Sequence, residues 1–83
     1  MKLQKYLQLS EDTQYDVLEH QGVLLAERDE AYCTLRLYSV GDFYVALHHH
    51  QHFNVIVQLE AFTPDSEHFD HWLDDIRIDD LLQ

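Results

Sequence analysis

The sequence predicts an α+β fold: a four-stranded antiparallel β-meander with an N-terminal and a C-terminal helix packed on one face. Three observations predict it. Apolar and polar residues alternate through most of residues 31–62, short turn segments interrupt this alternation, and apolar residues at helical spacing stand before and after it. Because no repeat, linker or low-complexity tract divides the 83 residues, we expect one small domain over residues 1–83.

The N-terminal segment is expected to be helical. Apolar residues at helical spacing predict a short helix or a docking arm within residues 1–9. A second helix is expected near residues 11–20, because Ser10 is a suitable N-cap and acidic residues follow it in the first turn. Gly22 should end this helix.

Four strands should follow, from Val23 to the charged residues 28–30 and then over about residues 31–39, 43–49 and 54–62. Gly41 and Asp42 supply a tight turn, and Pro64 closes the last strand. Alternation assigns these residues to the core face: Cys33, Leu35, Leu37, Phe43, Val45, Leu47, Val55, Val57, Leu59 and Ala61. The intervening side chains, Ile56 among them, should point to the opposite face.

The C-terminal segment is expected to form an amphipathic helix that begins at Asp65 or Ser66 and covers the sheet. One apolar stripe runs along it: Phe69, Trp72, Leu73 and Ile76. The C-terminal end of a helix carries the negative end of its dipole, which disfavours aspartates. The regular helix should therefore stop near Asp75.

Charge excludes some partners. Sixteen acidic and five basic residues give a formal net charge of −11, which repels phosphate, so we expect neither nucleic acid nor a membrane as a partner. The single Cys33, expected to be a buried thiol, and the lack of a signal peptide or long apolar run predict a cytoplasmic protein. No nucleotide loop, nucleophile elbow or multi-cysteine metal pattern is present, so we do not expect an enzyme.

Several segments are similar to a group of short, uncharacterised bacterial proteins: LLAERDE, LYSVGDFYVALHHH, NVIVQLEAFT and HWLDDIRIDDLL, which together span about residues 18–82. In that group a DFYV-type strand leads into a hairpin and then into an amphipathic C-terminal helix. The resemblance implies no assigned activity and therefore no functional residue. The histidines that follow Leu47 depart from the group and would be particular to this chain.

Two candidate sites emerge from the predicted strands. The face opposite the helices should carry amphipathic aromatic and polar side chains typical of a recognition surface: Tyr32, Arg36, Tyr38, Tyr44, His48, Gln58 and Glu60. The hairpin 48–52 is rich in histidine, and His48, His50 and His52 would share one face of an extended chain. Imidazoles in that arrangement can bind zinc or nickel, with Glu60 on the paired strand as a further polar group.

These observations predict a small acidic interaction domain that acts by binding another protein or by self-association through the open aromatic face. Its partner would be a second copy of the chain, in a homodimer, or a basic protein. The alternative is a metal-binding or metal-responsive protein that uses the histidine hairpin, although we expect no resident cofactor. Mimicry of nucleic acid by ordered carboxylates rests on the net charge alone.

Overall fold

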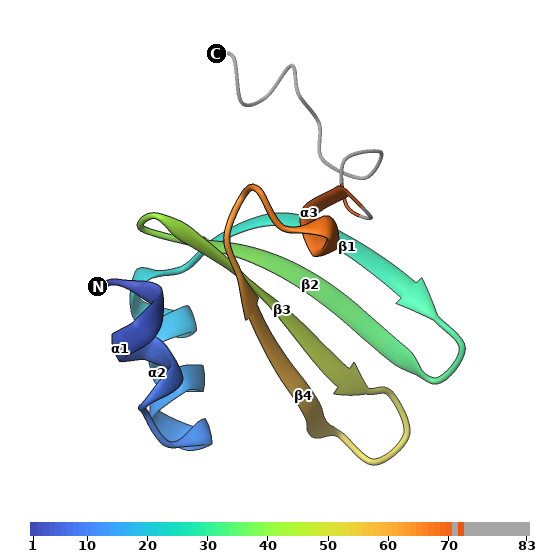
Figure 1. Ribbon diagram of the computed structural model, residues 1–83. Helices are drawn as coiled ribbons and strands as arrows, with labels where there is room; N and C mark the ends of the chain where they lie inside the picture. The colour runs from blue at the N-terminus through green and yellow to red at the C-terminus, as the bar shows by residue number, and fades with distance from the viewer. Residues whose placement is uncertain (71, 73–83) are drawn as a thin grey trace.

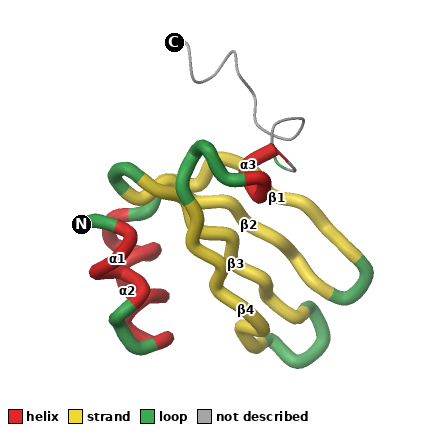
Figure 2. Tube along the Cα trace, viewed as in Figure 1, coloured by secondary structure: helices red, strands yellow, loops and turns green. Residues whose placement is uncertain are grey.

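The computed structural model describes residues 1–70 and 72, shown in Figure 1. Two short helices precede the sheet: α1 (Leu3–Leu7) and α2 (Glu11–Gln21). The strands are β1 (Val23–Glu30), β2 (Cys33–Val40), β3 (Phe43–His50) and β4 (Val55–Phe62), and a single helical turn, α3 (Glu67–Asp70), follows them. Figure 2 shows α1 and α2 side by side at one end of the sheet.

The four strands form one antiparallel sheet in the order β1-β2-β3-β4, which confirms the predicted meander. The predicted tight turn is also confirmed, because Gly41 and Asp42 join β2 to β3 and Val40 pairs directly with Phe43. Gly41 has φ +58, a left-handed conformation that glycine adopts without strain. The prediction of an α+β chain with a helical N-terminal side is therefore correct.

Helix α2 begins and ends where the sequence predicts. Ser10 caps it, since its Oγ accepts a hydrogen bond from the backbone N–H of Thr13 at 3.3 Å. Gly22 ends it, and its N–H donates to the carbonyl of Leu18. A side chain is not tolerated easily at Gly22, because a Cβ there would lie 2.5 Å from the oxygen of Leu18.

Both faces of the sheet carry a packed apolar cluster. We call one face the helix-side face, because α1 and α2 pack on it. Its buried cluster combines side chains of these helices with side chains of β2 and β3: Tyr6, Val17, Leu18, Val40, Phe43, Val45 and Leu47. The second face points the other way and holds a cluster that includes Trp72: Ala26, Leu35, Leu37, Ala46, Phe62 and Trp72. The chain therefore uses both faces of its sheet for cohesion.

The predicted core face is wrong, and the turn explains why. Because a two-residue turn pairs Val40 with Phe43, each odd-numbered residue of β2 opposes an even-numbered residue of β3, and paired residues share a face. Leu35 and Leu37 therefore lie on the second face, whereas Val45 lies on the helix-side face. Cys33 is half-buried beside the second cluster.

Three further predictions, all in strand β4, are wrong. Val55 and Val57, expected in the core, are more than half exposed. Ile56, expected on the opposite face from the core, packs against the helix-side cluster. An irregularity in the pairing with β3 is the cause, since the register shifts between His48 and His49.

The expectation that the N-terminal and C-terminal helices share one face is also wrong for the described part of the C-terminal segment. Trp72 belongs to the cluster on the second face, opposite α1 and α2. The single turn α3 precedes it, close to the predicted start at Asp65 or Ser66. The predicted continuation to Asp75, with Leu73 and Ile76 in its stripe, lies outside the described residues.

Candidate interaction surface

The seven residues expected to form one binding face lie in three places. Arg36 and Tyr38 lie on the helix-side face, and Tyr32 lies in the turn before β2. The remaining four lie on the second face, on β3 and β4: Tyr44, His48, Gln58 and Glu60. The prediction of a single face made of all seven is therefore wrong, while a role of individual members in binding stays a prediction.

On the helix-side face, the predicted residues make contacts within the protein. Nε of Arg36 lies 2.8 Å from Oε2 of Glu27 on the neighbouring strand, and this hydrogen bond raises the pKa of the guanidinium. Tyr38 packs against the apolar cluster below α2. A hydrogen bond with Glu19 raises the pKa of the neighbouring Tyr15.

The second face carries a small polar hollow of about 160 Å³ above Leu35 and Ala46. On one side, the guanidinium of Arg28 lies 4.6 Å from the ring centroid of Trp72, while its Nε lies 3.0 Å from Oε1 of Glu30. On the other side, Nε2 of His48 lies 3.7 Å from Oε2 of Glu60. Each of the two carboxylates thus has a basic side chain beside it, Arg28 for Glu30 and His48 for Glu60.

The β1–β2 turn and the β3–β4 loop lie next to each other at the end of the sheet away from α1 and α2 (Figure 1), and they carry the two most exposed aromatic side chains of the described residues, Tyr32 and Phe53. Tyr32 of the turn stacks on His50, with ring centroids 6.3 Å apart and planes inclined by 8°. Phe53 of the loop lies 4.8 Å from the same imidazole. The backbone N–H of Gln51 donates to the carbonyl of Tyr32 at 2.8 Å, so the two connections are tied together.

His50 organises the β3–β4 loop. Its Nδ1 accepts hydrogen bonds from the backbone N–H groups of His52 and Phe53, at 3.2 and 3.3 Å. The N–H of Asn54 donates to the carbonyl of His50 at 3.0 Å, and Asn54 has φ 53, which turns the chain back into β4. This geometry assigns the ring proton of a neutral His50 to Nε2.

The predicted metal ligands do not converge. His48 points toward Glu60 on the second face, and Nδ1 of His50 is occupied by the loop backbone. The rings of His50 and His52 have centroids 6.0 Å apart. Within residues 1–70 and 72, no group of three histidine, cysteine, aspartate or glutamate side chains is arranged to hold a metal ion.

We define the distal patch as four large apolar side chains that are between 52% and 75% exposed: Tyr32, Phe53, Val55 and Val57. Sequence reasoning included Tyr32 but missed the other three. Simple alternation assigns the two valines to the core, and Phe53 lies just beyond the predicted histidine hairpin 48–52. An aromatic residue within the otherwise polar segment HHHQHFN was the available signal.

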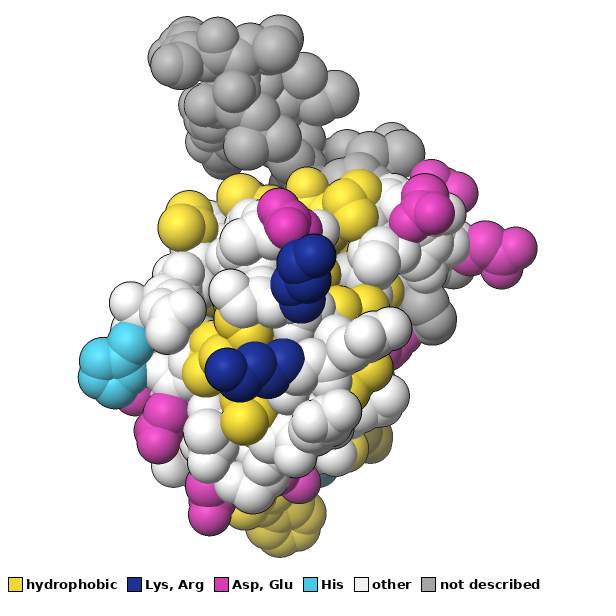
Figure 3. Space-filling model, turned by 60° about the vertical axis from the view of Figure 1, so that its left-hand side comes forward, with side chains coloured by type: hydrophobic (Ala, Val, Ile, Leu, Met, Phe, Trp, Pro, Cys, Tyr) yellow, Lys and Arg dark blue, Asp and Glu magenta, His cyan; other side chains and the backbone are white. Residues whose placement is uncertain are grey.

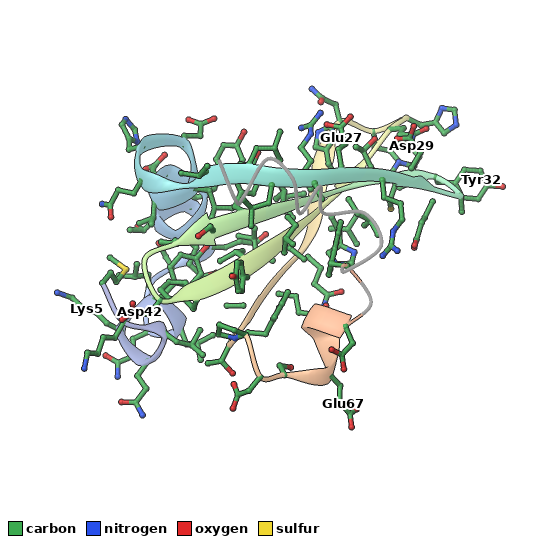
Figure 4. All side chains as sticks on the ribbon, turned by 90° about the horizontal axis from the view of Figure 1, so that it is seen from above. Lys5, Glu27, Asp29, Tyr32, Asp42 and Glu67 are labelled. Atoms are coloured by element: carbon green, nitrogen blue, oxygen red, sulfur yellow. The ribbon has the colours of Figure 1, made fainter. Side chains whose placement is uncertain are left out.

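The basic side chains of the N-terminal segment lie elsewhere. Figure 3 shows lysine or arginine side chains gathered over the α1 side, and Figure 4 places Lys5 and Asp42 at the opposite end of the molecule from Tyr32. A shallow cavity of about 440 Å³ lies there, lined by Lys2, Leu3 and Thr63 among others. Its walls come from α1, from the β2–β3 turn and from the chain just beyond β4.

No protein-family model, curated protein or solved structure matches this chain in the comparisons made. The resemblance to short bacterial proteins therefore stays a prediction. None of the helices in the described part of the chain has the length and apolar character needed to cross a membrane.

Proposed function

We propose that this protein is an interaction domain that binds another protein through the distal patch, and that it acts by binding, not by catalysis. One observation carries the proposal: four large apolar side chains stand exposed on two adjoining hairpins of a strongly acidic chain, and the two aromatic ones both contact His50. Exposed apolar patches of this kind are typical of protein-binding sites, and aromatic side chains dominate the energetics of such sites.

The hydrogen bonds of the two connections support this proposal, because they hold the patch in place before any partner arrives. The backbone bond from Gln51 to Tyr32 ties the loop to the turn, and the two bonds to Nδ1 of His50 hold the loop itself in one conformation. A preorganised surface loses less conformational entropy on binding. The same contacts give the β3–β4 loop a defined conformation.

The proposal keeps the kind of function that the sequence predicts and changes its location. The predicted open face is divided between two packed faces of the sheet, so we place recognition at the end of the sheet. Of the predicted surface residues, Tyr32 alone belongs to the distal patch, and His48 and Glu60 lie on the second face.

Site-specific photo-crosslinking in the cells that make the protein tests the proposal. A benzoylphenylalanine at position 53 should give a discrete crosslinked adduct, because Phe53 is the most exposed member of the patch. The matched control carries the same probe at position 7, since Leu7 is 58% exposed but lies on α1. Adducts from position 7 alone, or from neither position, would contradict the proposal.

A further inference from the structure

We propose that the partner binds as an extended, basic segment that adds to the outer edge of β4 as a fifth strand. This inference rests on the proposed function and specifies the occupant of the distal patch. Strand addition uses backbone hydrogen bonds for affinity and side-chain contacts on alternate residues for selectivity. Three features of the described residues support it, namely the chemistry of the two sheet edges, the position of α1 and the distribution of charge, and a fourth, a β-bulge, limits the length of the added strand.

The two edges of the sheet differ in chemistry. β1 and β4 are the outer strands, and β1 carries four consecutive charged residues over Glu27–Glu30. Charged side chains along an edge oppose the pairing of another strand. In contrast, β4 has no charged residue from Val55 to Leu59, and both of its exposed valines lie in this stretch. An uncharged edge with exposed valines is suited to accept a strand.

The helices leave this part of β4 accessible among the described residues. α1 approaches β4 near its C-terminal end, where Lys2 and Leu3 line a cavity together with Thr63. Val55 and Val57 stand at the other end of the strand, next to the loop that carries Phe53. Figure 1 shows this end of β4 away from α1 and α2.

A β-bulge at Val57 shapes the edge. Gln58 pairs with His48 and Ile56 pairs with the next residue, His49, so Val57 is the extra residue in β4. A bulge increases the local twist and shortens the regular edge on either side of it. This geometry opposes an extended pairing of copies into an open-ended sheet and limits any added strand to a short segment.

Charge selects a basic segment over a second copy of this chain. Two copies would bring together a formal charge of −11 − 11 = −22, whereas a cationic segment would be attracted from a distance. Figure 4 places Asp29 at the same end as Tyr32, and Lys5 lies at the opposite end. Asp29 of the β1–β2 hairpin therefore places a negative charge at the end of the molecule that carries Tyr32.

The test uses the full chain, labelled with ¹⁵N, and synthetic peptides as probes. The first peptide alternates valine and threonine and carries lysines at both ends; the second replaces the lysines with glutamates; the third is the first with alternate backbone amides methylated. The basic peptide should shift amide resonances of residues 53–59 and slow hydrogen exchange in β4. Its affinity should fall as salt is raised, and the acidic and methylated peptides should bind about tenfold more weakly or not at all.

A matched pair of variants locates the site. Val57→Lys should weaken binding of the basic peptide by about tenfold, because it places a charge on the proposed edge. Val23→Lys adds the same charge at a residue of similar exposure, 60% against 56%, but on β1, and should change the affinity by less than about twofold. Circular dichroism should show the same fold for both variants.

Other results would overturn the inference. Equal binding of the methylated peptide would exclude strand addition, and equal binding of the acidic peptide would exclude charge selection. Shifts centred on β1 would place the site elsewhere, and no shift with the basic peptide at millimolar concentration would exclude addition of a basic strand to β4. A stable dimer in sedimentation, with β4 protected from exchange, would identify a second copy as the occupant. A crosslinked adduct at position 53 without peptide binding would leave the proposed function standing and remove only this inference.

Discussion

Replacing Tyr6 with phenylalanine should destabilise the protein at neutral pH and leave its stability almost equal to that of the parent near pH 11. Tyr6 is 1% exposed, and its hydroxyl donates a hydrogen bond to the carbonyl oxygen of Gln14 at 3.0 Å. Nε2 of Gln14 donates in return to the carbonyl oxygen of Tyr6 at 2.9 Å, so α1 is tied to α2 in both directions. Losing the hydroxyl should cost about 1 kcal/mol of unfolding free energy.

The pH dependence follows from the burial of the same hydroxyl. Burial raises the pKa of Tyr6 from 10.0 to about 12, because the phenolate is poorly solvated in the folded protein. The protonated phenol therefore favours folding, and its contribution is fully present below the unfolded pKa and is lost as pH rises through the folded value. At pH 11, midway between the two values, the parent should have lost about 1.4 kcal/mol. That loss is similar in size to the hydrogen bond missing from the variant.

Urea unfolding of the parent and the Tyr6→Phe variant at pH 8, 9.5 and 11, followed by far-ultraviolet circular dichroism, measures the difference directly. Tyr15, whose pKa is also raised, is present in both proteins, so its effect on the difference cancels. A difference that stays constant from pH 8 to pH 11 would refute the reasoning about Tyr6. A loss above about 3 kcal/mol at pH 8 would show instead that the ring has moved from Phe43, whose centroid lies 5.2 Å away.

Two further predictions concern the end of α2 and the histidine hairpin. Gly22→Ala should lower the unfolding free energy by about 1 to 3 kcal/mol, because the new Cβ would press on the oxygen of Leu18; an unchanged urea midpoint would contradict this contact. Zinc should not remain bound at one ion per chain after gel filtration, because His50 already accepts two backbone hydrogen bonds. Elemental analysis measures this, and one retained ion, lost when the three predicted ligands become asparagine, would show that the hairpin is a metal site.

Local features of the fold could be predicted because their signals lie within a few residues. Ser10 and Gly22 mark the ends of α2 through hydrogen bonds to neighbouring turns, and the structure places the helix between them. Gly41 and Asp42 mark the β2–β3 turn in the same way. Such contacts depend on short stretches of sequence, and tertiary packing did not override them here.

The assignment of faces failed because it depends on how strands pair, and pairing is not a local property. The alternation of apolar and polar residues within one strand can be read from the sequence. Which residues of the next strand share a face with them depends on the length of the turn and on any bulge. The two-residue turn reversed the phase between Leu37 and Val45, and the bulge at Val57 changed it again in β4. Counting the pairs outward from Val40 and Phe43 would have corrected the first error.

The position of the distal patch follows from the size of the chain. A domain this small has little core, since it buries only about 60% of the area that its unfolded chain exposes, and it therefore depends on both faces of its sheet for cohesion. Here α1 and α2 occupy the helix-side face, and Trp72 with its cluster occupies part of the second face, so cohesion consumes the surfaces where recognition was predicted. The edge of β4 and the connections at the end of the sheet, where we propose recognition, lie outside both clusters. Phe53 and Val57 are exposed there, and their exposure removes no side chain from the two buried clusters, because neither residue belongs to a cluster.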